Sequence, residues 1–266
     1  MKETSFRMLR ALCVTGVFVV AAQSNGVLAQ TPSPTPAGPP VPELLSITVV
    51  SVKPGMVPQF QEFMKSNTNP ALKKGGLKWR AVWQSTTAAG DAFEYALVAP
   101  MTKFAEYDGP SVIEKALGAP GSAAWQAKAG SFVNTVRRYI VRTRPDLSNY
   151  VARSGPPKIA VITSIRVAQN RNTDFENYIR NDFVPVMKQA QVGYSVSQTI
   201  FGGDASEYVT LTLREAFADL DKGPVIVQAL GADGATKLLQ KLPAGTITHI
   251  ERSIIRYVPE LSFGSP

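Results

Sequence analysis

The segment IAVITSIRVAQNRNTDFENYIRNDFVPVMK, residues 159–188, decides the fold because it repeats a pattern found earlier, at residues 45–73. When Phe175 is aligned with Phe60, the two segments match without a gap, and Pro185 falls on Pro70. Each copy begins with a β-branched apolar run, which is typical of a buried strand. Apolar residues at helical spacing follow, so each copy predicts a strand followed by a helix.

The rest of the chain predicts the same order of elements twice. The first half predicts strands at Leu44–Val52, Leu77–Ser85, Phe93–Val98 and Phe132–Arg142, with helices from Val57 and over Met101–Leu117 and a loop at Ala119–Ser122. The second half predicts strands at Ile159–Val167, Gly193–Phe201 and Glu207–Leu213, a helix over Thr173–Gln189, and a closing strand that contains His249. Both halves therefore predict the order β-α-β-β-α-β.

This order predicts an α+β fold made of two tandem ferredoxin-like modules, residues 44–148 and 158–262, joined by a linker at 149–157. A ferredoxin-like sheet carries both helices on one face and leaves the other face bare. We therefore expect the two sheets to pack sheet to sheet as an intrachain α/β barrel.

The sequence pattern at the start of the chain is typical of an export signal. Three basic residues precede an apolar run at residues 11–22, and Val27-Leu28-Ala29 then offers a cleavage site. The run is too short for a permanent span, although an uncleaved anchor is the alternative interpretation. We expect an exported protein, periplasmic or secreted, with residues 30–43 as a proline-rich tether.

Cysteine content and charge exclude several classes of function. Cys13, the only cysteine, lies in the predicted signal, so the mature chain would have no disulfide and no thiolate metal site. Removing residues 1–29 leaves 25 basic and 19 acidic residues, a net charge of +6. The basic residues form no cluster, so nucleic acid is not an expected partner. The positive charge favours either anionic ligands or an anionic cell surface; the alternative is a merely soluble basic surface.

The motifs of the first half resemble the dimeric α/β-barrel superfamily, nearest to its NIPSNAP-like branch. The matching features are Lys53-Pro54-Gly55, a helix rich in aromatic residues, Pro70-x-Leu72-Lys73, and Gly90-Asp91 followed by Glu94-Tyr95. The superfamily includes cofactor-free monooxygenases, haem-degrading enzymes and chlorite dismutases, so the resemblance implies a fold more strongly than a reaction.

Three residues of the second half are candidates for one polar pocket. His249 is the only histidine, and strand alternation places it on the same face of its strand as Glu251. Arg166 lies on a neighbouring predicted strand. We identify His249 and Arg166 as candidate catalytic residues and Glu251 as a candidate ligand-binding residue; a structural ion-pair network with Glu207 or Glu251 is the alternative.

Tyr178, Asn181 and Tyr194 are candidates for an aromatic-lined pocket between helix and sheet, although such residues also suit a plain core. Overall we expect a small-molecule-binding or interaction protein, monomeric or homodimeric, with a small apolar or aromatic ligand. The alternative is a cofactor-independent monooxygenase acting on a planar aromatic substrate. No cofactor or metal is expected; His249 could hold haem, but no second histidine or cysteine would complete a metal site.

Overall fold

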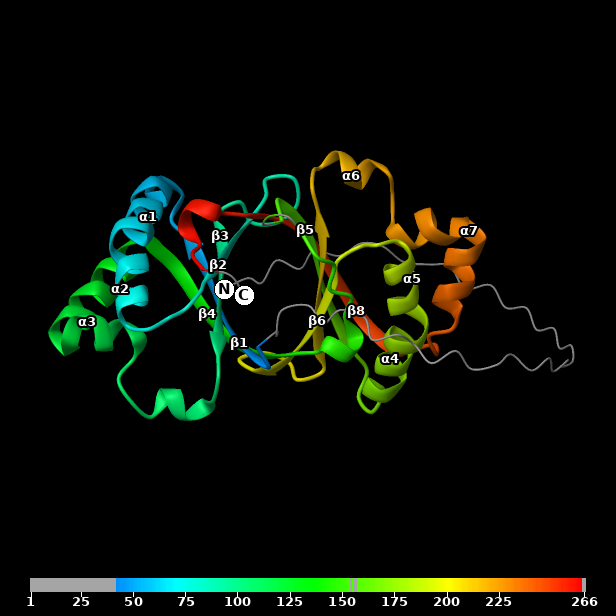
Figure 1. The fold of residues 1–266 in the computed structure, drawn as a ribbon, viewed down its shortest axis with the longest axis horizontal. Coiled ribbons are helices and arrows are strands. Elements are labelled where there is room, and N and C mark those ends of the chain that lie inside the picture. Colours follow the sequence, from blue (N-terminus) through cyan, green and yellow to red (C-terminus); the bar gives the residue numbers. More distant parts are fainter. Residues whose placement is uncertain (1–41, 154, 156, 265–266) are drawn as a thin grey trace, which may run out of the picture. The chain divides into compact units, whose positions relative to one another are not determined.

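A computed structural model describes residues 42–153, 155 and 157–264 (Figure 1). The expected export signal and nearly all of the expected tether lie outside the described residues. Within the described ranges, no helix is both long and apolar enough to cross a membrane.

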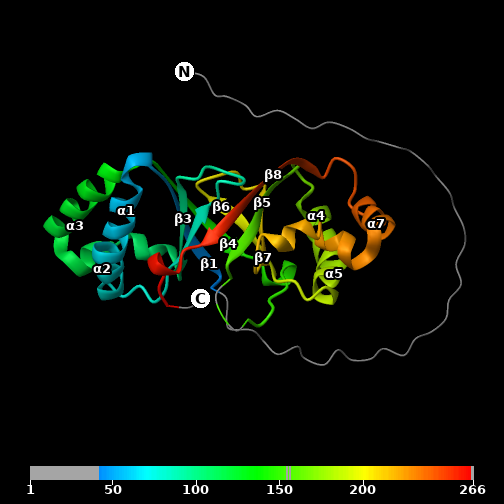
Figure 2. The same cartoon turned by 90° about the horizontal axis from the view of Figure 1, so that it is seen from above.

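Eight antiparallel strands close into one barrel, with helices on its two outer sides (Figures 1 and 2). The order around the barrel is β1-β3-β2-β8-β5-β7-β6-β4. The strands are β1 (Leu44–Val52), β2 (Ala81–Ser85), β3 (Glu94–Met101), β4 (Val133–Thr143), β5 (Ile159–Val167), β6 (Tyr194–Phe201), β7 (Glu207–Arg214) and β8 (Ile247–Tyr257). Closure leaves no unpaired sheet edge in this barrel.

The strand pairing has the same pattern in both halves of the chain. In the first half β1 lies between β3 and β4, and in the second half β5 lies between β7 and β8. Two seams join the halves: β2 pairs with β8, and β4 pairs with β6. The expected α+β barrel is therefore present, closed by backbone hydrogen bonds across both seams as well as by facing side chains.

The first helical segment of each half contains one wider, π-helical turn at the same place. These segments consist of α1 (Val57–Phe63), the turn Met64–Thr68 and α2 (Asn69–Lys74), and of α4 (Asn172–Tyr178), the turn Ile179–Phe183 and α5 (Val184–Gln189). In both, a proline follows the turn in the next helix, where its missing N–H costs least.

The prediction of a loop at Ala119–Ser122 is wrong. The helix α3 (Val112–Phe132) continues through it, with a kink at Gly118, whose φ of 71° requires the left-handed conformation that glycine tolerates. Pro120 then lies in the first turn of the next helical stretch, where proline is accepted. The helix α7 (Val225–Gln240) has the same kink at Gly231, and the short α6 (Ala218–Asp221) precedes it.

The two helix–sheet cores exchange their last segments. Leu147, in the short helix Pro145–Leu147 that follows β4, is fully buried in the core of the second half. Val258 and Leu261, at the end of β8, are buried in the core of the first half. Each core is therefore completed by a segment from the other half.

Truncating an exchanged leucine should destabilise the whole protein. We expect Leu261→Ala and Leu147→Ala each to lower the free energy of unfolding by about 2–5 kcal/mol, because each removes a fully buried side chain and leaves a cavity. Urea denaturation followed by circular dichroism measures this. Leu239→Ala, at a position 55% exposed, is the control and should change stability by less than about 0.5 kcal/mol. A loss below about 1 kcal/mol for either buried leucine would contradict the exchange.

Candidate functional site

The sheet has two faces with different chemistry. The face beneath the helices is apolar and aromatic, and in the second half it packs Phe175, Tyr178, Tyr194 and Tyr208 into one core. The opposite face lines the inside of the barrel, which we call the lumen. At its centre Trp83 and Ile255 pack with apolar residues from both halves. The β2–β3 and β6–β7 hairpins lie at one end of the lumen, which we call the hairpin end (Figure 2). Polar side chains gather at this end.

A pocket of about 360 Å³ opens at the hairpin end. Its lining side chains come from three adjacent strands, β5, β7 and β8, and are Ser164, Arg166, Glu207, Thr248, His249 and Glu251. In the ladder Arg166 lies directly between Glu207 and His249, and Ser164 lies beside Glu251. Cross-strand neighbours share a face of the sheet, so these groups converge. The sequence-based grouping of Arg166, His249 and Glu251 therefore matches the geometry.

Hydrogen bonds divide these groups into occupied and available ones. The Glu207 carboxylate accepts hydrogen bonds from the Ser164 hydroxyl and, at 3.2 Å, from Thr199 Oγ1. Arg166 Nε lies 3.0 Å from Asp204 Oδ2 in the β6–β7 hairpin. The expected ion pair of an arginine with Glu207 or Glu251 is thus replaced by one with Asp204, and Glu207 is held by hydroxyl groups.

The side chains of His249 and Glu251 form no hydrogen bond or ion pair with any residue that the structure describes. They are the pocket groups available to a ligand. A neutral imidazole offers one donor and one acceptor, and an ionised carboxylate offers acceptors only. The pocket can therefore bind a small molecule that carries both donors and acceptors.

The first half contributes charge to the same end of the lumen. Burial raises the pKa of the Glu94 carboxyl above its ordinary value; Asp91 and Glu251 add to the increase, while Arg137 opposes it. Glu94 and Glu251 thus interact electrostatically although they belong to different halves. Sequence analysis did not assign Glu94 to the site. The sequence did contain a clue to its role: Glu94 begins the third strand of the first half, as Glu207 begins the third strand of the second half.

The structure separates Tyr178, Asn181 and Tyr194 from this pocket. Tyr178 and Tyr194 lie on the helix side of the sheet, buried in the core of the second half, and Asn181 is exposed on the π-helical turn. Burial raises the pKa of Tyr178 to about 12, and the nearby Asp182 adds to the increase. The Tyr178 hydroxyl is buried and has no hydrogen-bond partner among the residues that the structure describes. The expected ligand-binding residues thus fall into two groups on opposite faces of the sheet.

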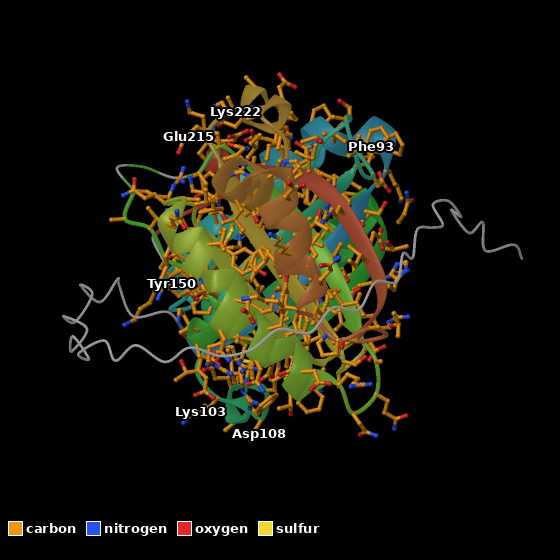
Figure 3. The ribbon with its side chains drawn as sticks, turned by 90° about the vertical axis from the view of Figure 1, so that its right-hand side faces the viewer. Phe93, Lys103, Asp108, Tyr150, Glu215 and Lys222 are labelled. Atoms are coloured by element: carbon orange, nitrogen blue, oxygen red, sulfur yellow. The ribbon has the colours of Figure 1, made fainter. Side chains whose placement is uncertain are left out.

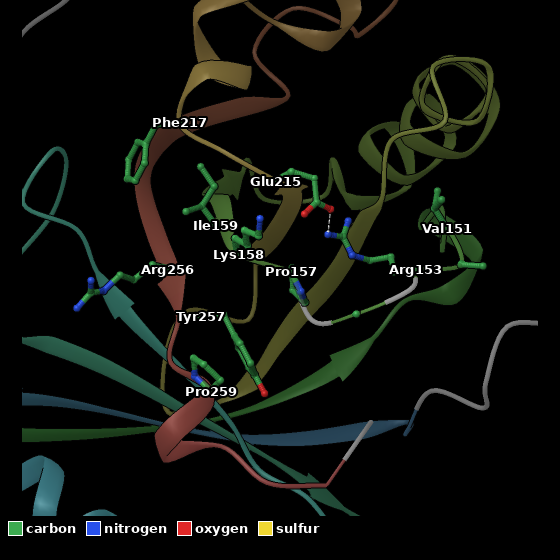
Figure 4. A pocket seen from close by; sticks show the side chains of 12 residues that line it. Val151, Arg153, Pro157, Lys158, Ile159, Glu215, Phe217, Arg256, Tyr257 and Pro259 are labelled. Atoms are coloured by element: carbon green, nitrogen blue, oxygen red, sulfur yellow. Dashed lines mark hydrogen bonds and ion pairs between the residues drawn. The ribbon is translucent and has the colours of Figure 1, made fainter.

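A larger cavity, of about 940 Å³, lies where the chain passes from the first half to the second (Figure 4). Phe217 and Arg256 form one side of it, and the ion pair of Arg153 with Glu215 crosses another. Its wall includes linker residues on both sides of positions 154 and 156, which are not described. We take the hairpin-end pocket as the candidate site, because its lining residues all lie on strands β5, β7 and β8 and all are described, whereas part of the wall of the larger cavity is the linker.

The hairpin-end pocket does not fit haem. A porphyrin needs apolar walls against both faces, whereas this pocket is lined by four ionisable side chains together with serine and threonine. In the described part of the chain, no group of three or more His, Cys, Asp or Glu side chains is placed to hold a metal ion.

Replacing Glu94 should stabilise the protein at neutral and higher pH. Its pKa is raised in the folded state, so the folded protein binds the proton more tightly than the unfolded chain does. The ionised group therefore lowers the free energy of unfolding above the folded pKa, and this cost is absent below the unfolded pKa. We expect Glu94→Gln to raise the urea midpoint at pH 8 but not at pH 3. Glu62→Gln, on the exposed surface of α1, is the control. An equal effect at both pH values would contradict this account.

Comparison with protein-family profiles and with curated sequences finds no match. Solved structures with the same fold include a candidate monooxygenase of Fusobacterium nucleatum, with a TM-score of 0.54, 10% identity, and coverage of 80% of this chain and 91% of that chain. An anthrone oxidase-like protein matches with a TM-score of 0.53, 8% identity, and coverage of 81% and 91%.

A chlorite dismutase from Candidatus Nitrospira defluvii, in complex with imidazole, matches with a TM-score of 0.51 and 8% identity, over 82% of this chain and 91% of that chain. At such low identity the likeness shows the fold alone.

Proposed function

We propose that this protein binds a small polar molecule in the hairpin-end pocket of the barrel. The observation that carries the proposal is the juxtaposition of unpaired His249 and Glu251 with Arg166 in a pocket of about 360 Å³. Arg166 and His249 would bind an anionic oxygen, and Glu251 would accept a hydrogen bond from a hydroxyl or ammonium group. Hydroxy acids and amino acids have this combination.

The volume and lining of the pocket support a small polar ligand. It lies near the lower end of the range of ligand sites, roughly 300–1,000 Å³. Its lining is polar, whereas pockets for planar aromatic molecules are mostly apolar. Catalysis at this site would use His249 as a proton acceptor or donor, with Glu251 orienting the substrate.

A second candidate is oxidation of a planar aromatic molecule, as the names of the monooxygenase and anthrone oxidase-like neighbours suggest. The unpartnered Tyr178 hydroxyl favours it, because a buried hydroxyl without a partner costs about 1–3 kcal/mol and a ligand carbonyl would satisfy it. With its pKa raised, this phenol would act as a neutral donor. Tyr178 is buried in the same core as Phe175 and Tyr194, so this core must open before a ligand can reach the hydroxyl.

We also propose that the chain arose by tandem duplication, that it lies nearest the NIPSNAP-like branch, and that the mature protein is exported. The matched motifs and the equal strand pairing of the two halves support the first two statements. The basic and apolar pattern before Ala29 supports the third.

Intact-mass spectrometry of protein recovered outside the cytoplasm tests the proposed export. Cleavage after Ala29 should give a chain that begins at Gln30. Recovery of the full-length chain from the cytoplasm alone would contradict export.

A thermal-shift panel of short hydroxy acids, amino acids and planar phenols separates the two candidate functions. We expect a hydroxy acid or amino acid at about 100 times its dissociation constant to raise Tm by roughly 5–10 °C. Arg166→Gln and Glu251→Gln should abolish the shift. Arg171→Gln, an exposed arginine paired with Asp174 at the start of α4, should not. Stabilisation by a phenol that is lost in Tyr178→Phe would favour the second candidate, and a polar-ligand shift that survives Arg166→Gln would refute the first.

A further inference from the structure

Strands β4 and β8 present the same outward face at the two seams of the barrel. The outward side chains are Val136, Arg138, Ile140 and Arg142 on β4, and Ile250, Arg252, Ile254 and Arg256 on β8. Position by position, the two strands carry the same outward residues, except that β4 has Val136 where β8 has Ile250.

The lumen faces of the same two strands differ. Arg137 on β4 occupies the position that Glu251 has on β8, a reversal of charge, and Tyr139 occupies that of Ser253. Similarity between the strands is therefore concentrated on the outward face. A shared origin of the halves does not by itself explain why only one face of each strand kept its residues.

Packing does not explain this face either, because much of it is exposed. Val136 is 45% exposed and Ile250 is 47% exposed. An exposed phenylalanine follows a nearby strand beyond the Arg142 or Arg256 end of each face: Phe104, after β3, at 45%, and its equivalent Phe217, after β7, at 46%. Phe104 also contacts Phe201, with ring centroids 5.3 Å apart. Apolar side chains exposed at equivalent places indicate a surface that a partner covers.

The charges on these faces indicate what kind of partner this is. Arg142 lies 3.7 Å from Glu43, and Arg256 donates a hydrogen bond of 2.8 Å to Gln84. By contrast, Arg138 and Arg252 form no ion pair or hydrogen bond with residues 42–153, 155 or 157–264. An apolar strip beside an unpaired guanidinium complements a partner with apolar and carboxylate side chains.

The placement of the two seams favours a protein segment over a lipid surface. In the closed barrel, three strands separate β4 from β8 in either direction, so their outward faces point to opposite sides. Figure 3 shows Lys103, next to Phe104, and Lys222, beyond Phe217, on opposite sides of the molecule. One flat membrane cannot cover both faces together, whereas two copies of a peptide can.

We propose that each seam face binds an acidic, partly apolar peptide segment of a partner protein, so that one chain carries two equivalent docking surfaces. The apolar residues of the segment pack on Val136 and Phe104, or on Ile250 and Phe217. Its carboxylates pair with Arg138 or Arg252. This surface is separate from the pocket in the lumen, and its occupancy does not depend on the proposed function.

Selection of random peptides on the immobilised protein, followed by calorimetry of the enriched peptide, tests this proposal. We expect acidic peptides with apolar residues to be enriched and to bind two per chain. Arg138→Glu and Arg252→Glu should each remove one site, and the double variant should bind at least tenfold more weakly. The control is Arg171→Glu, a change at the exposed residue that immediately precedes α4. Circular dichroism verifies the fold of each variant.

Three outcomes would overturn the proposal. The first is that no acidic peptide is enriched. The second is binding at two sites that persists in Arg138→Glu/Arg252→Glu. The third is that vesicles containing phosphatidylglycerol bind through these arginines while the enriched peptides do not, which would assign the faces to anionic lipid.

Discussion

The exchange of C-terminal segments between the two halves is the constraint on which the rest of the structure depends. Leu147 is buried in the core of the second half, and Leu261 is buried in that of the first. Polar contacts hold both segments. Asn69 donates a hydrogen bond to the Leu261 carbonyl at 3.1 Å, and the Asn149 side chain donates to the Val192 carbonyl at 2.8 Å. Neither core is complete without the other half, so the seams and the lumen are fixed together.

The contacts that hold the exchanged segments differ between the two halves. In the second half Glu176 on α4 binds both Arg144, from the end of β4, and the Tyr208 hydroxyl. Hydrogen bonding to Arg144 holds the pKa of Glu176 below its ordinary value. In the first half the equivalent pair is neutral, with Gln61 donating to Tyr95. An ionic contact in the second half and a neutral contact in the first half thus occupy equivalent positions.

Strand alternation and the internal repeat predicted much of this structure. They placed β1 and β5 at their observed ends and put Arg166, His249 and Glu251 on one face. They could not show that Tyr178 and Tyr194 face away from that pocket, because a residue pattern does not reveal which face the helices cover. The contribution of Glu94 from the other half was also hidden, since it depends on barrel closure. The helix through Pro120 was missed because glycine and proline also mark loops.

The central claim is that the two halves form one cooperative unit, because each core is closed by a segment of the other. Native-state hydrogen exchange in increasing denaturant tests it most directly. The amide of Val258 bonds the Val82 carbonyl, and the amide of Arg144 bonds the Val196 carbonyl, so one amide reports on each exchanged segment. The account predicts that both exchange only by global unfolding, with equal free energies and equal denaturant slopes. Exchange of one segment through a partial unfolding that leaves the other half protected would contradict it.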